Sequence, residues 1–162
     1  MKLYFVRHAT AARKSTWSKD DDLRPLTRAG RAHFRNAATS LIAAGMLSPD
    51  RILTSPLVRA TQTAAILSRA LSSEVPIQEE WRLGHTFDVN DLRALLAQKP
   101  RAKSLAIVGH NPSMCAVLSQ ITGDCDLDLR KGAVALIEIS DAKMPSGRLM
   151  WLAPPTLFGP PC

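Results

Sequence analysis

The sequence predicts an α/β fold with a largely parallel sheet. Short apolar runs, which indicate buried strands, alternate with segments whose apolar residues recur at helical spacing. Such alternation is typical of domains in which helices cover a parallel sheet. The composition, with 46% hydrophobic and 22% charged residues over 162 residues, is that of one globular domain with its own core. We therefore expect a single domain over residues 1–162, a three-layer α/β/α sandwich with an irregular proline-rich tail at 153–162.

The strands are predicted where apolar runs are bounded by polar or turn residues. The first run, KLYFV at residues 2–6, precedes a polar loop that extends through three consecutive aspartates. The other strands are expected at residues 51–54, 104–108, 133–139 and 148–152. The last two flank Pro145-Ser146-Gly147, a turn sequence that predicts a hairpin. The order of the strands in the sheet does not follow from this pattern.

The helices are predicted from apolar stripes and from residues that start or stop a helix. Thr27 is a suitable N-cap for a helix that Gly45 ends. Ser55-Pro56 and Asn111-Pro112 each combine an N-cap residue with proline at the first helical position. A further helix is expected at residues 88–98.

The positive charge of the chain gathers near its beginning. The formal net charge is +7, and residues 1–35 hold nine Lys and Arg against three Asp. The remaining residues are nearly balanced, with twelve basic against eleven acidic side chains. This asymmetry favours an anionic substrate or partner, although a solvated basic face explains the same counts. No recognised nucleic-acid-binding motif accompanies the charge, so nucleic acid is not an expected partner.

The apolar runs and the cysteines favour a cytoplasmic protein. No apolar run approaches the roughly 20 residues of a membrane span, and the apolar start is too short for a signal peptide. The cysteines, Cys115, Cys125 and Cys162, show neither a CxxC pair nor zinc-like spacing. We therefore expect a cytoplasmic location, no membrane partner, and free thiols.

Three unusual segments follow predicted strands. Arg7-His8 follows the first strand, residues 55–59 follow the second, and Gly109-His110-Asn111 follows the strand at 104–108. In open α/β sheets the carboxyl ends of the strands form the ligand crevice. These segments should therefore meet at one edge of the sheet.

The side chains at that edge suit a phosphate. Arg7 and Arg59 supply two permanently charged planar forks, and the helix starts add backbone N–H groups. A neutral imidazole is a competent nucleophile, and nearby arginines should lower its pKa. A backbone carbonyl bonded to one ring nitrogen would aim the other at phosphorus. His8 and His110 are both placed for this role. Each of these residues alone is commonly structural, so the hypothesis depends on their joint occurrence.

Four stretches resemble the motifs of the histidine phosphatase superfamily, whose members have a phosphoglycerate mutase-like fold. LYFVRHA at residues 3–9 resembles the RHG signature, LTSPLVRATQTA at 53–64 the second motif, and VGHNP at 108–112 the third. LRPLTRAG at 23–30 is similar to the RPLT-x-x-G segment of the short SixA-like phosphohistidine phosphatases. Ala9 departs from the pattern, because the family usually has glycine there, and its methyl group could slightly reshape the loop.

The resemblance implies roles for individual residues. His8 would be the nucleophile, and Arg7, Arg59 and His110 would bind the phosphoryl group. No metal or cofactor is implied, since the arginines compensate the charge. Glu80 lies roughly where the family places a glutamate that donates a proton to the leaving group. Glu79 and Glu80 fit equally well as exposed charges on an edge segment.

The substrate is left open between two classes. Larger members of the family carry long insertions over the site, whereas only about 30 residues separate the second helix from the strand at 104–108. The pocket should therefore be shallow and open, which suits a phosphate on a protein surface. Phosphohistidine in proteins is the favoured substrate, because its imidazole leaving group needs little protonation. A small phosphomonoester is the alternative substrate, and a non-catalytic phosphate-binding module is an alternative of a different class. The oligomeric state does not follow from the sequence.

Overall fold

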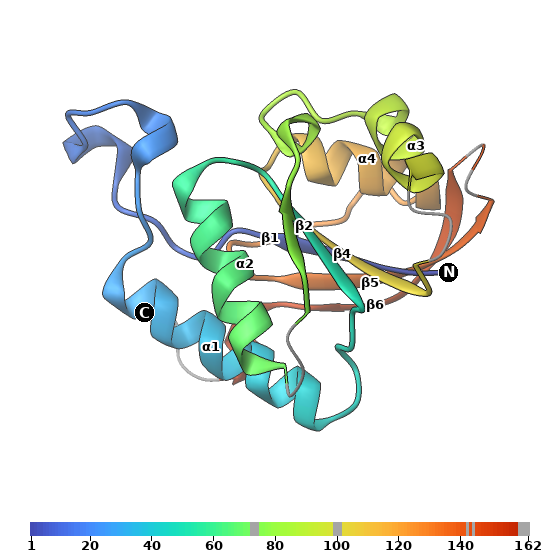
Figure 1. The fold of residues 1–162 in the computed structure, drawn as a ribbon, viewed down its shortest axis with the longest axis horizontal. Helices are drawn as coiled ribbons and strands as arrows, with labels where there is room; N and C mark the ends of the chain where they lie inside the picture. Colours follow the sequence, from blue (N-terminus) through green and yellow to red (C-terminus); the bar gives the residue numbers. More distant parts are fainter. Residues whose placement is uncertain (72–74, 99–101, 142, 144, 159–162) are drawn as a thin grey trace.

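A six-stranded mixed sheet forms the centre of this computed structural model (Figure 1). The structure describes residues 1–71, 75–98, 102–141, 143 and 145–158. The strand order is β3-β2-β4-β1-β5-β6, in which β1 to β4 run parallel and β5 pairs antiparallel with both neighbours. The strands are β1 (Lys2–Arg7), β2 (Arg51–Thr54), β3 (Ile77–Glu79), β4 (Ser104–Gly109), β5 (Val134–Asp141) and β6 (Ser146–Ala153). The largely parallel α/β fold expected from the alternation is confirmed.

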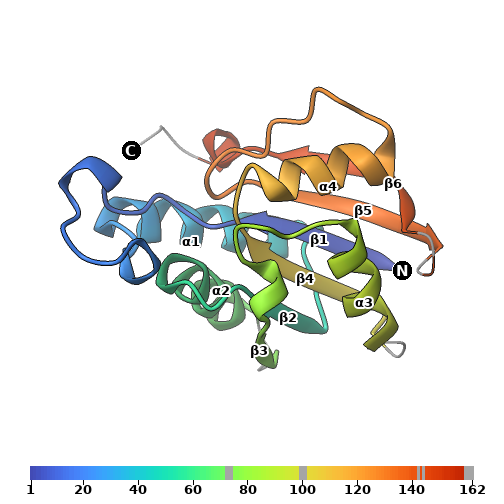
Figure 2. The ribbon, with the colours of Figure 1, turned by 90° about the horizontal axis from the view of Figure 1, so that it is seen from above.

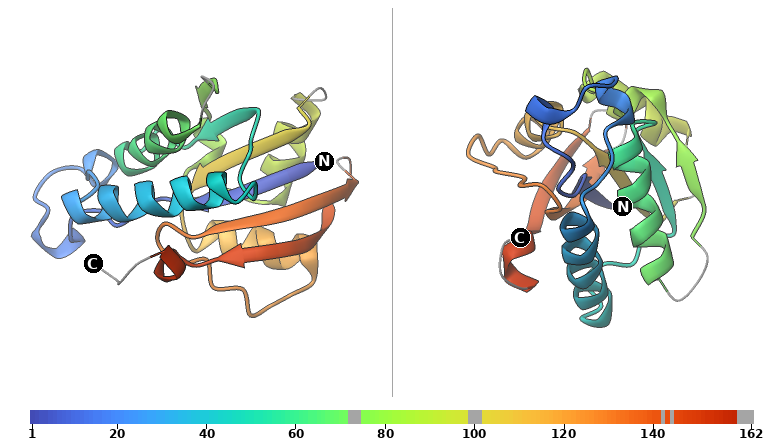
Figure 3. Two further views of the ribbon diagram at one scale, coloured as in Figure 1. Left: turned by 90° about the horizontal axis from the view of Figure 1, so that it is seen from below. Right: turned by 90° about the vertical axis from the view of Figure 1, so that its left-hand side faces the viewer.

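Helices cover both faces of this sheet and complete the expected three layers (Figures 2 and 3). One face carries α1 (Arg28–Ala43) and α2 (Val58–Ala70), and the other carries α3 (Val89–Gln98) and α4 (Ser113–Thr122). Successive side chains of β1 point to opposite faces of the sheet. Tyr4 and Val6 pack in the core of the first face, and Leu3 and Phe5 pack in the core of the second.

The predicted start of α1 is confirmed and explains the RPLT-x-x-G pattern. The Thr27 hydroxyl caps the helix by accepting a hydrogen bond from the Gly30 N–H at 2.9 Å, and it donates to the Thr10 carbonyl at 3.3 Å. A Cβ atom on Gly30 would overlap that same Thr10 oxygen. Glycine is therefore required where the first turn of α1 packs against the loop that follows β1.

The predicted N-caps of α2 and α4 are wrong. Helix α2 begins at Val58 after Leu57, and α4 begins at Ser113 after Pro112, in neither case with a side-chain cap. Ser55 and Asn111 lie further upstream because their side chains make other contacts. The Ser55 hydroxyl contacts His110, and the Asn111 amide donates to the Leu129 carbonyl at 3.0 Å.

Two parts of the chain differ from the expected elements. The edge strand β3 was not predicted, because its three exposed residues show no alternation of apolar and polar side chains. The tail expected to be irregular contributes Ala153 to β6 and forms a 3-10 helix, η4 (Pro155–Phe158), whereas residues 159–162 lie outside the described residues. Cys115 and Cys125 are free thiols as expected, and Cys162 also lies outside that part. Within the described ranges, no helix has the length and apolar character needed to cross a membrane.

The sheet brings the three unusual segments to one edge. Strands β1 and β2 both flank β4, and the register pairs Arg7 with Gly109 and Thr54 with Val108. All three strands are parallel, so their carboxyl ends coincide. The residues that follow them line the candidate site.

Candidate active site

His8 lies in the loop directly after β1 and is buried. Its Nδ1–H donates a hydrogen bond to the Ala9 carbonyl at 2.8 Å, which leaves the lone pair on Nε2. Burial lowers the pKa of His8 to about 3, and the charges of Arg59 and Arg7 add to this effect. The ring is therefore neutral at physiological pH, and its unprotonated nitrogen is Nε2, which does not take part in the contact with the backbone.

Arg59 extends from the first turn of α2 and is only 1% exposed. Its guanidinium donates to the Asp21 carbonyl at 2.7 Å and pairs with the Asp21 carboxylate at 3.0 Å. A helical side chain leans toward the N-terminus of its helix, which is why Arg59 points over the sheet edge. Its Nε is buried without a hydrogen-bond partner.

Arg7, the last residue of β1, provides the second guanidinium. Its Nη1 donates to the Leu129 carbonyl at 3.0 Å, and its Nε is also buried without a partner. Burial lowers the pKa of both Arg7 and Arg59 from the usual value for arginine. Both side chains remain cations, because arginine is not deprotonated in proteins.

His110 follows β4 and packs beside His8, with 5.1 Å between the ring centroids. Its Nε2 lies 2.8 Å from the Ser55 hydroxyl, and its Nδ1 is buried without a partner. Burial lowers the pKa of His110 to about 2, and the charge of Arg59, like that of His8 when it is protonated, acts in the same direction. The structure thus brings together His8, His110 and Arg59, which the sequence places far apart.

Comparison with known proteins assigns the chain to a family. The family model described as histidine phosphatase superfamily (branch 1) matches residues 3–85. A protein of Picosynechococcus sp., described as uncharacterized, is 39% identical over 117 residues, which cover 70% of this chain and 68% of the relative. The chain belongs to the histidine phosphatase superfamily.

Solved structures of similar shape confirm the fold expected for this superfamily. The protein histidine phosphatase SixA complexed with tungstate superposes with a TM-score of 0.86 at 23% identity, covering 98% of this chain and 100% of that one. A putative phosphohistidine phosphatase SixA from Agrobacterium tumefaciens gives 0.80 at 24% identity, with 94% and 97% of the two chains covered. The α-ribazole phosphatase of Shigella flexneri gives 0.71 at 17% identity, with 96% and 97% covered.

Ala9 occupies the position at which the superfamily usually has glycine. Its backbone N–H donates to the Thr63 hydroxyl at 3.1 Å, and its carbonyl accepts from His8. Ala9 does not adopt a positive φ, and its side chain is buried. The loop therefore accommodates the methyl group without the left-handed backbone that would require glycine.

Glu80, the predicted proton donor, lies directly after β3. It is 7% exposed, and its Oε1 accepts from the Arg82 backbone N–H at 3.3 Å and from the Arg82 guanidinium at 3.1 Å. The interpretation as an exposed charge holds for Glu79 and is wrong for Glu80. A role for Glu80 in proton transfer stays a prediction.

Sequence reasoning missed three polar residues around Arg59. Asp21 bridges two arginines, because its Oδ1 accepts from Arg24 Nε at 2.9 Å while its Oδ2 pairs with Arg59. This contact with Arg24 is the main cause of the lowered pKa of Asp21. His85 lies within 3.4 Å of Arg59 Nη2. Arg24 belongs to the RPLT-x-x-G segment, which was the available signal, whereas Asp21 and His85 lie in segments without a motif.

One group of side chains has the spacing of metal ligands. Ligand atoms of Asp21, Asp22 and His85 all lie within 4.8 Å of one another, and they form the one such group in the described part of the chain. Both carboxylate oxygens of Asp21 already pair with guanidinium groups. The adjacent positive charges of Arg24 and Arg59 oppose a cation there. This set of donors therefore suits a cation poorly.

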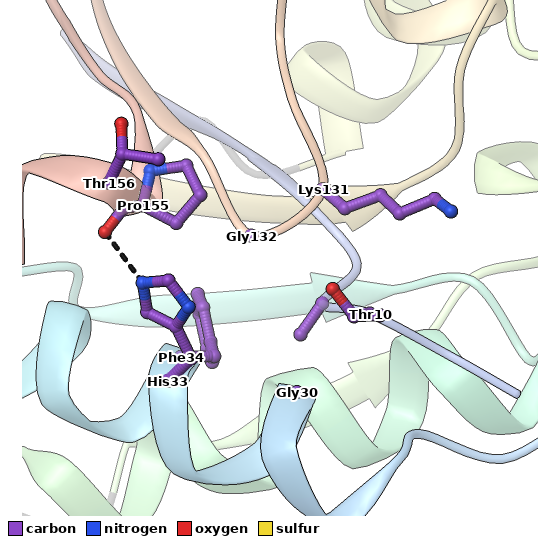
Figure 4. Close-up of a pocket in the computed structure, with 9 residues that line it drawn as sticks. Thr10, Gly30, His33, Phe34, Lys131, Gly132, Pro155 and Thr156 are labelled. Atoms are coloured by element: carbon purple, nitrogen blue, oxygen red, sulfur yellow. Dashed lines mark hydrogen bonds between the residues drawn. The ribbon is translucent and has the colours of Figure 1, made fainter. Parts of the chain in front are cut away.

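A small cavity of about 100 Å³ lies behind the loop that follows His8 (Figure 4). It is formed between α1, the loop before β5, and η4. His33 closes one side by donating from Nε2 to the Pro155 carbonyl at 2.7 Å, and the Phe34 ring lines the floor. The residues that line the cavity thus include the loop after His8 on one side and the start of η4 on the other.

Proposed function

We propose that this protein is a phosphatase that transfers a phosphoryl group onto His8, releases it to water, and acts on phosphohistidine in proteins. His8 is the proposed nucleophile, and Arg7, Arg59 and His110 are proposed to bind the phosphoryl group. No metal ion or cofactor takes part in the proposed reaction. The superfamily assignment supports a phosphoryl-transfer reaction, and the residue roles follow from the site.

The observation that carries this proposal is a set of buried nitrogen atoms without partners. Buried polar atoms in folded proteins nearly always make hydrogen bonds. In the part of the chain that the structure describes, four buried side-chain nitrogen or oxygen atoms have none, and three of them are Arg7 Nε, Arg59 Nε and His110 Nδ1. Phosphoryl oxygens accept hydrogen bonds from such groups. An oxyanion bound beside His8 would therefore give all three nitrogen atoms a hydrogen-bond partner.

The chemistry follows from the protonation states of these residues. His8 Nε2 attacks phosphorus while the bond to the leaving group breaks. The two guanidinium groups stabilise the charge that spreads over the three equatorial oxygens during transfer. Water then attacks the phosphohistidine formed on His8, which regenerates the neutral ring and releases phosphate. A module that only binds phosphate would gain nothing from a histidine held neutral with a free Nε2, so we favour the enzyme over the binding module.

The surface around the site supports a protein substrate. Trp81 is 72% exposed and Leu23 is 54% exposed. They belong to the 3-10 helices η3 (Trp81–Leu83) and η2 (Asp21–Leu23), and Asp22 of η2 lies 3.9 Å from His85, which follows η3 in the chain. Exposed apolar side chains beside an anion pocket provide contacts for a folded partner. The neighbours named SixA support phosphohistidine, whereas the α-ribazole phosphatase supports the small-phosphomonoester alternative.

The decisive experiment assays purified protein in parallel on a phosphohistidine-containing protein and on a panel of phosphomonoesters. We expect the highest kcat/KM on phosphohistidine and an acid-labile, base-stable phosphoenzyme that is absent from His8→Ala. His33→Gln is the matched control, because His33 lies in the cavity behind the loop.

Each other outcome selects a different function. If His8→Ala keeps more than a few per cent of the wild-type activity, the proposed mechanism with His8 as the nucleophile is wrong. Higher kcat/KM on a phosphomonoester would favour the alternative substrate class. Binding of phosphate without turnover on any substrate would favour the binding module.

A further inference from the structure

His85 is an exposed histidine in contact with Arg59. It follows η3, and 54% of its side chain is exposed to solvent. Its ring centroid lies 5.1 Å from that of His110, which in turn lies 5.1 Å from that of His8. The three imidazoles therefore form a row that begins at the buried nucleophile and ends at the surface.

The Nε2 atom of His85 lies beside a group that would hold the phosphoryl oxygens. It is 3.4 Å from Nη2 of Arg59, and the guanidinium donates to this nitrogen when the nitrogen carries no proton. An anion that binds Arg59 would therefore bind a residue that His85 also contacts. In an in-line displacement the leaving group lies opposite the nucleophile, and because His8 is buried, the leaving group would lie toward the exposed side.

Charged groups of both signs face His85. The carboxylate of Asp22 lies 3.9 Å from Nε2 and supplies a negative charge for an imidazolium, and the carboxylate of Asp21 belongs to the same cluster. Arg59 and His110 face the ring from the pocket side. Histidine is the side chain that most readily gains and loses a proton near neutral pH.

Glu80, the residue in the position expected for a donor, is less accessible. It is buried, and its Oε1 makes both of its contacts with Arg82. His85, in contrast, combines solvent exposure with direct contact to Arg59. Both residues are candidates for the proton donor to the leaving group, and the structure favours His85.

We propose that His85 is the general acid and base of this site, an assignment that rests on the proposed function. In the first step His8 Nε2 forms a bond to phosphorus and the bond to the leaving atom breaks, which is a ring nitrogen in phosphohistidine and an oxygen in a phosphomonoester. The protonated Nε2 of His85 gives that atom its proton. In the second step a water oxygen bonds to phosphorus, the bond to His8 breaks, and neutral His85 takes the proton from the water. The cycle returns both histidines to their starting states and releases phosphate.

The test compares leaving groups in the His85→Asn variant. The rate of phosphoenzyme formation is measured in single turnovers with an aryl phosphate, whose phenolate leaves without protonation, and with an alkyl phosphate, whose alkoxide is strongly basic. We expect a loss of about 10² to 10⁴-fold with the alkyl ester and less than about fivefold with the aryl ester. The phosphoenzyme formed from the aryl ester should also accumulate, because water attack is slowed.

Controls separate this role from a structural one and from a failure of the proposed function. Tungstate affinity should change less than about twofold in His85→Asn, because the ring is not needed to bind the anion. Equal losses on both esters, or no loss on either, would overturn the assignment. A leaving-group-dependent loss in Glu80→Gln with none in His85→Asn would transfer the role to Glu80. Failure of the wild type to form phosphoenzyme on His8 would instead overturn the proposed function, and this assignment with it.

Discussion

The hydroxyl of Thr63 accepts a hydrogen bond from the backbone N–H of Ala9 at 3.1 Å. The same hydroxyl donates to the carbonyl of Arg59 at 2.7 Å, one turn back in α2. One buried side chain thus joins the loop that holds His8 to the helix that holds Arg59. The relative positions of the His8 ring and the Arg59 guanidinium depend on this link.

Replacement of Thr63 by valine should therefore reduce both activity and stability. The variant keeps the shape of the side chain but leaves the Ala9 N–H buried without a partner, which costs about 1–3 kcal/mol in free energy of unfolding. A small displacement of reacting groups lowers kcat/KM by about 10 to 100-fold. Urea unfolding and phosphatase assays measure the two effects. Thr61→Val is the control, because the Thr61 hydroxyl bonds only within its own helix, to the Val58 carbonyl at 3.0 Å. Similar behaviour of the two variants would contradict the link.

Substitution of Arg59 by lysine should lower kcat/KM by roughly 10²-fold or more. The guanidinium uses Nη1 and Nη2 for Asp21 and still has Nε for an anion, whereas one ammonium group cannot serve both. Steady-state kinetics on phosphohistidine provide the measurement. Arg69→Lys, an exposed change in the last turn of the same helix, should be silent. Full activity of Arg59→Lys would show that charge alone matters at this position.

The free energy of unfolding should depend on pH because His8 is neutral in the folded protein. The pKa of His8 is about 3 in the folded protein, against 6.5 for an ordinary histidine in the unfolded chain. Between these values the unfolded chain binds a proton that the folded protein does not, so stability falls as pH falls from 6.5 toward 3. We expect wild-type unfolding free energy to decline more steeply than that of His8→Gln, by up to about 1.4 kcal/mol per pH unit. Urea unfolding at pH 7, 6, 5 and 4 tests this, and parallel slopes would disprove it.

Activity should not depend on a metal ion. Arginines occupy both carboxylate oxygens of Asp21, and in the proposed mechanism the guanidinium groups of Arg7 and Arg59 compensate the phosphate charge. Dialysis against EDTA is expected to leave kcat/KM unchanged, and added Mg²⁺, Mn²⁺ or Zn²⁺ should not raise it. An activity that EDTA abolishes and one of these ions restores would count against the arginine-based mechanism.

The fold could be predicted where apolar periodicity is strong. Buried strands such as β1 and β4 and the stripe of α1 produce patterns that tertiary contacts do not override. The edge strand β3 could not be predicted, since it forms by backbone pairing with β2 and its exposed residues show no apolar pattern. The starts of α2 and α4 were misplaced because Ser55 and Asn111 resemble caps locally but contact residues far away in sequence, His110 and Leu129. The local contact of the Ser55 hydroxyl is with the Leu57 N–H, before α2 begins.

The site could be predicted as far as strand ends and motifs identify it. His8, Arg59 and His110 follow three strands whose carboxyl ends must coincide in a parallel sheet. Asp21 and His85 could not be found this way, because they reach Arg59 from irregular segments whose paths depend on tertiary packing. The burial of Glu80 was hidden for the same reason.

The hydrogen bond from His8 Nδ1 to the Ala9 carbonyl has a consequence for the products of phosphoryl transfer. Phosphohistidine exists as two regioisomers, and with Nδ1 occupied His8 can form only the one that carries phosphorus on Nε2. Attack opposite the leaving group inverts the configuration at phosphorus, and the proposed mechanism contains two such displacements. A chiral phosphoryl group transferred through His8 to water would therefore emerge with its original handedness. The Ala9 carbonyl thus fixes the regiochemistry of the proposed intermediate, and the two displacements fix the stereochemistry of the overall reaction.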